Sequence, residues 1–203
     1  MSEDSAKLAS LVGSRLCHDL VSPVGAIGNG LELIALSGAP GADEMALIED
    51  SCASARARIN FFRVAFGHAS AEQMVGRNEA GKLLAELGAG GRLAADWSAP
   101  GDAPRREVQL AYLAYLCCES ALPQGGTVRI ERADPGAWRI TGTGPRISVE
   151  PGIWAQLSTT SLVPEMTPAR VHFACLARLA SERGKILRAM PGEAAVTIEL
   201  LPA

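Results

Sequence analysis

The sequence contains no cluster of Lys or Arg residues, and its formal net charge at pH 7 is −3. Without a basic cluster it has no electrostatic footprint for duplex nucleic acid or for an anionic membrane surface, so we expect neither partner. It also lacks the roughly 18 uninterrupted apolar residues of a membrane span. Its acidic beginning, MSEDSAK, has neither the basic region nor the apolar core of a signal peptide, which predicts a cytoplasmic protein.

The sequence also lacks a C-x-x-C pair and has few histidines. The five cysteines form an odd set without a C-x-x-C pair, which indicates reduced thiols and argues against a structural zinc site. The three histidines are His18, His68 and His172. A metal-dependent hydrolase built on the His18-Asp19 pair needs more His and Asp ligands than the chain offers, so we expect no metal site.

Apolar residues make up 48% of the sequence and charged residues 20%, which is ordinary for a folded globular protein. The pattern changes near residue 70, from two long helical segments to shorter segments that alternate between helix and strand. We therefore expect an α+β protein of two domains, a helical hairpin over residues 1–72 and a second domain over residues 76–203.

The first segment predicts a long helix, because its apolar residues recur every three or four positions: Leu8, Val12, Leu16, Leu20, Val24, Ile27, Leu31 and Ile34. Gly38, Pro40 and Gly41 then break the pattern, and Asp43 is a plausible N-cap for a second helix. That helix has its own apolar stripe, which runs from Met45 to Phe66. Together the two segments predict an antiparallel helical hairpin.

The apolar arc of the first helix is wider than one partner helix can cover, because Cys17 and Val21 extend it. We therefore expect a homodimer in which two hairpins form a four-helix bundle around a two-fold axis. The alternative is that residues 75–203 of the same chain cover the stripe.

His18 is rotated by about 200° from Leu16 and Leu20 on the helix, so it is expected to face solvent. An exposed histidine is often no more than a polar surface residue. Here, however, the residues on its side of the helix are small: Ser14, Ser22, Gly25 and Asn29. Pro23 and the glycines also weaken the helix. That cost indicates a functional surface, on which a neutral imidazole can act as a nucleophile and Asp19 can orient the ring.

The second domain combines helical and strand patterns in the order of a two-layer α/β sandwich. The two strand patterns on either side of the turn residues between 132 and 137 predict a β-hairpin. We expect helices over 77–87, 106–122 and 167–184, a short helix over 150–158, and strands over 92–97, 125–132, 137–142, 185–190 and 194–201.

The stretch CHDLVSPVGAIGNGLELI, from Cys17 to Ile34, resembles the H box of sensor histidine kinases. It is closer still to the first helix of ChpT-type histidine phosphotransferases of bacterial phosphorelays. The resemblance implies that His18 is the phosphoryl carrier and that Asp19 assists it.

Residues 76–203 resemble the ATP-binding domain of histidine kinases, with its nucleotide boxes degenerate. In that alignment Cys117 replaces the Mg²⁺-binding asparagine, Gly142 replaces the adenine-binding aspartate, and Arg146 replaces a glycine. A thiol is a poor ligand for Mg²⁺, and glycine has no side chain to accept a hydrogen bond from adenine. The resemblance therefore implies no nucleotide and no cofactor bound by this chain.

The implied activity moves a phosphoryl group between receiver-domain aspartates through phosphohistidine, with Mg²⁺ supplied by the receiver. The implied donor is the receiver domain of a hybrid histidine kinase, and the implied acceptors are response regulators of the CtrA and CpdR type. The expected receiver-docking residues are Leu11, Ser14, Arg15, Ser22, Gly25 and Asn29. Leu11 is expected on the exposed side of the helix, two turns before His18. Arg15 is expected either to steady the phosphoryl oxygens or to be an ordinary surface arginine. The alternatives are an active dimeric histidine kinase and a non-catalytic dimeric scaffold for response regulators.

Overall fold

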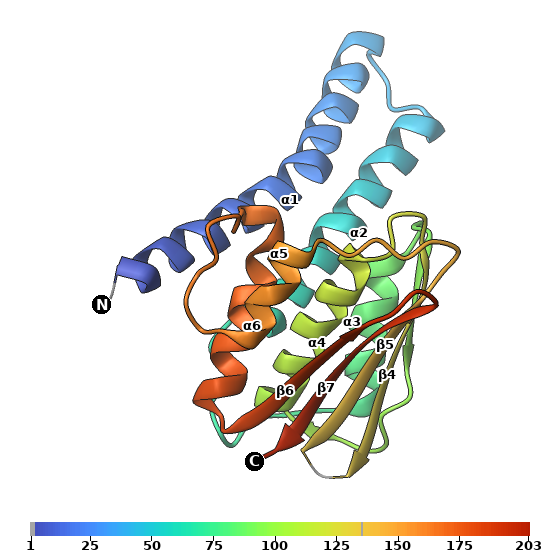
Figure 1. Cartoon of the computed structure of the whole chain (residues 1–203). Coiled ribbons are helices and arrows are strands. Elements are labelled where there is room, and N and C mark those ends of the chain that lie inside the picture. The colour runs from blue at the N-terminus through green and yellow to red at the C-terminus, as the bar shows by residue number, and fades with distance from the viewer. Residues whose placement is uncertain (1–2, 135) are drawn as a thin grey trace.

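The computed structural model describes residues 3–134 and 136–203. Two long helices, α1 (Glu3–Ser37) and α2 (Ala42–Ala65), form an antiparallel hairpin whose tip projects from the rest of the chain (Figure 1). The two helices approach each other closely at Gly30, where an added Cβ would lie 2.6 Å from Cγ1 of Ile48. Only glycine permits this approach, so the predicted hairpin is confirmed and Gly30 has a packing role.

Pro23 lies inside α1 and is buried, yet the helix continues through it. Its ring removes one backbone hydrogen bond and crowds the preceding turn, which favours a bend. In Figure 1 the second half of α1 runs more steeply than the first half. The N-cap of α2 is Gly41, with no side-chain cap hydrogen bond, so the expected capping role of Asp43 is wrong.

The second domain is built on a five-stranded sheet in the order β2-β4-β5-β7-β6. Its strands are β2 (Leu93–Trp97), β4 (Gly126–Asp134), β5 (Ala137–Thr143), β6 (Lys185–Pro191) and β7 (Ala195–Pro202). Only the β2–β4 pair is parallel. The predicted hairpin is confirmed as β4–β5, which places Ile130 opposite Ile140.

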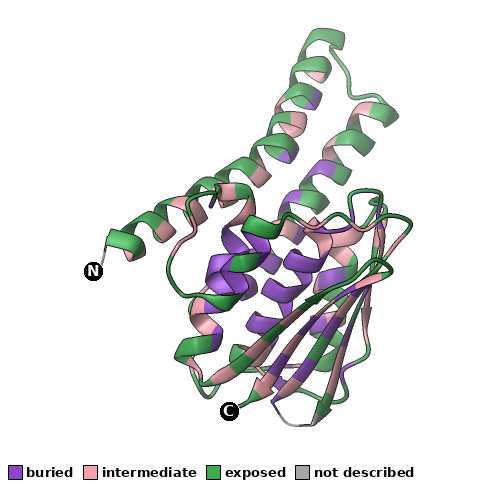
Figure 2. Cartoon of the chain, in the orientation of Figure 1, coloured by how far each residue is buried: buried purple, intermediate pink, exposed green. Residues whose placement is uncertain are grey.

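Helices α3 (Arg77–Gly88), α4 (Arg105–Ser120) and α6 (Val171–Glu182) cover one face of this sheet (Figure 1). Figure 2 shows that the buried residues gather between these helices and the sheet, whereas much of the projecting hairpin is exposed. The domain is thus the two-layer sandwich that the sequence predicts, with α4 as its central buried helix.

Some segments differ in detail from the sequence prediction. The segment over 150–158 forms α5 (Pro151–Trp154) followed by the 3₁₀ helix η1 (Ala155–Ser158). A further 3₁₀ helix, η2 (Pro168–Arg170), precedes α6, so the expected helix over 167–184 is shorter than predicted. Two short strands without a sequence signal, β1 (Met74–Val75) and β3 (Ala103–Pro104), pair with each other.

The hairpin is anchored to the second domain at the end of α2. The Phe61 ring stacks on Tyr112 of α4 at a centroid distance of 4.8 Å. Beside it, Nε2 of Gln109 donates hydrogen bonds to the carbonyl oxygens of Ala65 and Gly67, at 3.1 and 2.8 Å. The ring stack and the Gln109 hydrogen bonds, one buried and one partly buried, together fix how the hairpin leaves the domain.

The apolar stripe of α1 is covered along only part of its length. Its first part packs against the core of the second domain through Leu8, Leu11, Val12 and Leu16. Beyond Pro23, Val24 and Leu31 are 57% and 56% exposed, whereas Ile27 and Ile34 are partly buried. The second domain therefore covers the first part of the stripe, and this chain leaves the Val24 and Leu31 side chains open.

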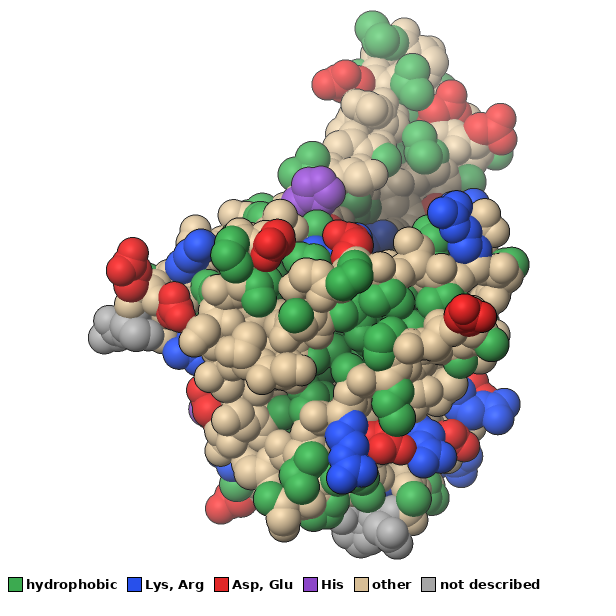
Figure 3. Space-filling model, in the orientation of Figure 1, with side chains coloured by type: hydrophobic (Ala, Val, Ile, Leu, Met, Phe, Trp, Pro, Cys, Tyr) green, Lys and Arg blue, Asp and Glu red, His purple; other side chains and the backbone are tan. Residues whose placement is uncertain are grey.

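Helix α1 is also long and apolar enough to cross a membrane by length and composition, with a mean hydropathy of 1.4 over its most apolar window. That window is 11% buried within the chain. Figure 3 shows hydrophobic side chains on the surface of the projecting hairpin.

Candidate functional site

His18 lies on α1 where the helix leaves the second domain. Its side chain is 86% exposed, in agreement with the solvent-facing position that the helix periodicity predicts. The ring nitrogen Nδ1 lies 3.2 Å from Oδ1 of Asp19. Since a carboxylate only accepts hydrogen bonds, Nδ1 carries the proton in this pair, and the lone pair of the neutral ring lies on Nε2.

Asp19 is held on its other side by Arg15, one helical turn earlier. Nε of Arg15 donates to Oδ2 of Asp19 at 2.6 Å, and the Asp19 side chain is 11% exposed. Nη1 of Arg15 donates to the backbone carbonyl of Ala169 in η2, at 2.7 Å. One carboxylate thus joins His18 to Arg15, and Arg15 joins the helix to the second domain.

The other small residues around His18 leave its face of the helix open. Ser14, Ser22, Gly25 and Asn29 are all exposed. A Cβ added at Gly25 or at Gly28 would meet no atom within 4 Å, in contrast to Gly30, which packs on α2. Gly25 and Gly28 therefore have no packing role within this chain, although each costs about 1 kcal/mol of helix stability relative to alanine.

Two expected docking residues lie elsewhere than on the open face. Leu11 is half-buried and packs on the core of the second domain, so its expected exposure is wrong. The Arg15 side chain is 18% exposed and already donates to Asp19 and Ala169, so it is not an ordinary surface arginine. In both cases the second domain covers a side of α1 that a single helix predicts to be free.

The region aligned with a nucleotide site is filled by the protein itself. An added Cβ at Gly142 would lie 3.1 Å from Val196 Cγ2, 3.2 Å from Cys118 Cβ and 3.3 Å from Leu122 Cδ1. These contacts leave hardly enough room for a methyl group, so an aspartate side chain does not fit at this position. Cys117 is fully buried, and burial raises the pKa of its thiol well above its usual value, so it stays protonated and is a poor ligand for Mg²⁺.

The glycines after β5 do not form a phosphate cradle either. An added Cβ at Gly144 would lie 2.4 Å from the carbonyl oxygen of Gly125, which is a hydrogen-bond acceptor. Anion sites need backbone N–H groups that point at the ligand. The residues aligned with the nucleotide boxes thus do not fit ATP or its Mg²⁺.

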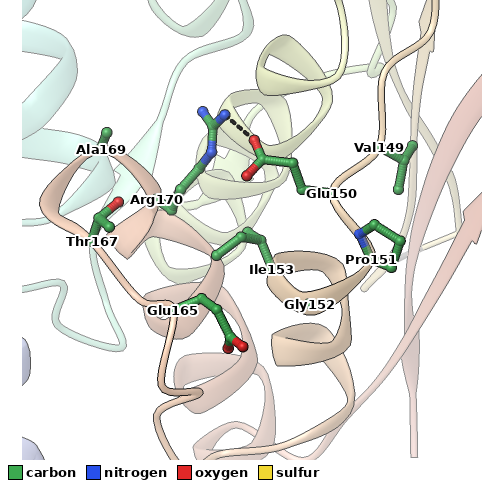
Figure 4. Close-up of a pocket in the computed structure, with 9 residues that line it drawn as sticks. All are labelled: Val149, Glu150, Pro151, Gly152, Ile153, Glu165, Thr167, Ala169 and Arg170. Atoms are coloured by element: carbon green, nitrogen blue, oxygen red, sulfur yellow. Dashed lines mark hydrogen bonds and ion pairs between the residues drawn. The ribbon is translucent and has the colours of Figure 1, made fainter.

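An open depression of about 530 Å³ lies between α5 and η2. Figure 4 shows the side chains of Arg170 and Glu150, which form an ion pair, pointing toward each other across it. Glu165 and Thr167 line it as well, whereas Cys117 and Gly142 do not. Cys117 and Gly142 thus lie outside the depression, and its carboxylates disfavour an anionic ligand.

His172, at the start of α6, is fully buried. Burial lowers the pKa of its imidazole well below the usual value, and the positive charges of Arg15 and Arg170 lower it further. The Leu116 carbonyl acts weakly in the opposite direction, but neither ring nitrogen forms a hydrogen bond of good geometry within the described residues. His172 is thus a neutral structural residue.

Three residues around Arg15 had no sequence signal. Glu119 at the end of α4 is largely removed from solvent, which raises the pKa of its carboxyl group, and Arg15 and Arg58 oppose that shift. Ala169 takes part through its backbone carbonyl, which no side-chain pattern reveals. His172 approaches Arg15 only because α6 folds back on α1.

Comparison with known proteins gives concordant results. The family described as the histidine phosphotransferase C-terminal domain matches residues 77–195. The chain is 39% identical over 149 residues to protein phosphotransferase ChpT of Brucella abortus (strain 2308), an alignment that covers 71% of each protein.

A solved structure agrees with this assignment. A bacterial phosphotransferase solved at 1.7 Å aligns over 98% of both chains, with a TM-score of 0.82 and 26% identity. The histidine kinase AdeS of Acinetobacter baumannii aligns over 90% of this chain and 95% of its own, with a TM-score of 0.43 and 11% identity. Since the family match and the alignment with the Brucella protein each cover more than half of the sequence, the chain belongs to the ChpT-type histidine phosphotransferases of phosphorelays.

Proposed function

We propose that His18 is the phosphoryl carrier of this phosphotransferase, and that it exchanges the group with receiver-domain aspartates without using ATP. The observation that carries the proposal is the His18-Asp19 pair. It fixes the proton on Nδ1 and presents Nε2 to solvent on a helix face cleared of large side chains.

In the forward step the lone pair of Nε2 attacks the phosphorus of an aspartyl phosphate. The N–P bond forms while the bond between phosphorus and the aspartate oxygen breaks, and the electron pair leaves with the receiver carboxylate. The proton stays on Nδ1, so the phosphorylated ring carries a positive charge that the Asp19 carboxylate stabilises at 3.2 Å. An aspartate of a second receiver reverses the same step and returns the electron pair to Nε2.

The absence of an ATP-dependent step is part of the proposal. It is supported by the contacts that fill the space around Gly142 and by the buried thiol at Cys117. We also assign the Mg²⁺ of the transfer to the receiver, because both oxygens of Asp19 already accept hydrogen bonds, from Arg15 and from His18. Positioning and charge neutralisation then supply most of the catalysis.

The receiver-docking surface is the open face of α1, formed by His18, Ser22, Gly25 and Asn29, with Ser14 one turn earlier. All five are exposed and small or polar. The open space above Gly25 and Gly28 lets another backbone approach the helix closely. We propose a hybrid kinase receiver as donor and response regulators of the CtrA and CpdR type as acceptors, because the H-box stretch resembles that of ChpT-type proteins.

A homodimer completes the proposal. Val21, Val24 and Leu31 form an apolar strip on α1 that the chain does not cover, and Val21 is 69% exposed. On α2, Met45 and Ile59 are exposed large apolar residues at positions a multiple of seven apart. Such spacing suits packing against the same hairpin of a second copy in a four-helix bundle.

A label-transfer assay tests the proposed function. The chain is mixed with a receiver phosphorylated on aspartate, and separately with labelled ATP and Mg²⁺. We expect an acid-labile, alkali-stable adduct only with the receiver, lost in His18→Ala and kept in His68→Ala, since His68 is the other exposed histidine. Incorporation from ATP alone would favour a kinase. Stable receiver binding without any label transfer would favour a scaffold.

A further inference from the structure

We propose that Arg15 is a positioning residue, through which the second domain holds Asp19 and thereby keeps the His18 ring in its reactive arrangement. The inference rests on the proposed function of His18. It assigns a role in phosphotransfer to a domain that does not fit a nucleotide.

The evidence is an uninterrupted chain of hydrogen bonds from the second domain to the imidazole. The Ala169 carbonyl accepts from Nη1 of Arg15 at 2.7 Å, and Asp19 Oδ2 accepts from Nε of Arg15 at 2.6 Å. Asp19 Oδ1 then lies 3.2 Å from Nδ1 of His18. Each carboxylate oxygen has one fixed partner, so the plane of the carboxylate, and with it the direction in which it faces the ring, is set.

The planar guanidinium suits this role better than any other side chain. Its N–H groups point in fixed directions, so one group bonds Asp19 while another bonds a carbonyl in a different domain. Residues 15 and 19 are one helical turn apart and lie on the same side of α1. The pair therefore forms locally, and the Ala169 carbonyl selects one arrangement of it.

The surroundings keep Arg15 in this position. Its side chain is 18% exposed, which limits water as a competing partner. The Glu119 carboxyl group interacts electrostatically with both Arg15 and Asp19, attracting the first and repelling the second. Glu119 therefore draws Arg15 toward the second domain and disfavours a swing of Asp19 in the same direction.

Arg15 is consequently unsuited to contact the phosphoryl group directly. Two of its nitrogen atoms already donate hydrogen bonds, and it points toward η2 rather than toward solvent. To reach a phosphoryl group on Nε2 it would have to break its bonds to Asp19 and Ala169. Its effect on transfer is therefore expected to pass through the state of the His18 ring.

The test measures the His18 ring and the transfer rate in the same set of full-length variants. The variants are Arg15→Gln, Arg15→Lys, His18→Ala and Arg178→Gln. Arg178 is the matched control, because its Nη2 also bonds across the domain junction, to Ser5 of α1 at 3.1 Å. Ser5 lies thirteen residues from His18, about 20 Å along the helix.

Nitrogen NMR of labelled histidine reports which ring nitrogen of His18 carries the proton, and single-turnover transfer from a phosphorylated receiver reports the rate. We expect Arg15→Gln to reduce the fraction of His18 protonated on Nδ1 and to slow transfer about tenfold, as expected for loss of a group that orients a reactive histidine. Arg15→Lys keeps the positive charge but lacks the planar guanidinium. Its Nδ1-protonated fraction of His18 and its transfer rate should both lie between those of Arg15→Gln and wild type. Arg178→Gln should change neither.

The inference is overturned if Arg15→Gln, with a thermal unfolding midpoint like that of wild type, leaves both the tautomer and the rate unchanged. It is also overturned if Arg178→Gln slows transfer as much as Arg15→Gln does, because domain docking alone would then explain the effect. If Arg15→Gln does not fold, an unchanged tautomer in Arg15→Lys with a wild-type rate overturns it. Label transfer that survives His18→Ala refutes the proposed function instead, while the NMR result still reports on Arg15.

Discussion

The imidazole of His18 and the carboxylate of Asp19 face each other at 3.2 Å, from Nδ1 to Oδ1, although the two residues are neighbours in the chain. Adjacent residues on a helix point about 100° apart. They meet here because the ring turns toward the carboxylate, which Arg15 holds from its other side. This contact keeps the proton of the His18 ring on Nδ1 and leaves the lone pair of Nε2 free.

Replacing Asp19 by asparagine tests this pairing. Asp19→Asn keeps the shape of the side chain, but it removes the negative charge that stabilises the phosphorylated ring, and the amide can present an N–H group to Nδ1. We expect the single-turnover rate of transfer from a phosphorylated receiver to fall about 10- to 100-fold. The matched control is Asp43→Asn, an exposed acid in the first turn of α2, which should leave the rate unchanged.

Gly25 provides a test of the docking surface that separates stability from binding. Gly25→Ala should raise the free energy of unfolding by about 1 kcal/mol, because alanine favours the helix and the added Cβ meets no atom. Gly25→Leu should fold equally well but weaken receiver binding, measured by titration calorimetry.

Gly30→Ala is the control, because it is expected to change the free energy of unfolding in the opposite sense to Gly25→Ala. Its Cβ would collide with Ile48, so it should lower the free energy of unfolding. Receiver affinity that stays at the wild-type value in Gly25→Leu would show that the receiver docks elsewhere.

The proposed dimer predicts that a charge in the apolar strip of α1 separates the subunits. Val24 and Leu31 are more than half exposed in the single chain, yet they lie on the face that we assign to the partner. A charge buried without a partner is costly, so Leu31→Asp should shift the chain from dimer to monomer in sedimentation equilibrium. Leu36→Asp is the control, because Leu36 is 85% exposed and lies on the His18 side of the helix. A wild-type chain that sediments as a monomer at micromolar concentration contradicts the proposal.

Periodicity predicted most of the architecture, since the helices and strands have local patterns that survive in the tertiary structure. The hairpin, the β4–β5 pair and the exposure of His18 follow from spacing alone. Spacing does not predict which side of α1 the second domain covers. Leu11 was expected to be exposed, because a helical wheel shows which residues share a face but not what packs against that face.

The hydrogen bond from Arg15 to Ala169 could not be predicted either, because it joins residues 154 positions apart through a backbone carbonyl. Strands β1 and β3 have two residues each, too few for any alternation to be visible. In each of these cases the sequence lacks the information locally, because the partners come from distant parts of the chain.

His172 predicts a pH dependence of stability. Its pKa is lowered in the folded chain, so below about pH 6.5 the unfolded chain binds a proton that the folded chain does not. Stability should therefore fall as the pH decreases from about 6.5. His172→Leu removes the group that binds this proton, together with two buried nitrogen atoms that lack good hydrogen bonds. The variant should therefore be more stable than wild type by about 1 kcal/mol at pH 5.5, with a smaller gain at pH 7.5.

Urea unfolding at the two pH values measures this difference, and the comparison with wild type cancels the contributions of other groups such as Glu119. The control is His68→Leu, because His68 is exposed. A stability difference for His172→Leu that is the same at both pH values would contradict the buried, neutral state of His172.

The central claim is that His18 carries the phosphoryl group. The most direct test is to map the phosphorylated residue by tandem mass spectrometry at neutral to alkaline pH, after the full-length chain has received phosphate from a phosphorylated receiver. The account predicts phosphate on the peptide that contains His18 and none on peptides that contain His68 or His172. Phosphate on either of those residues, or on a serine or threonine with His18 unmodified, would contradict it.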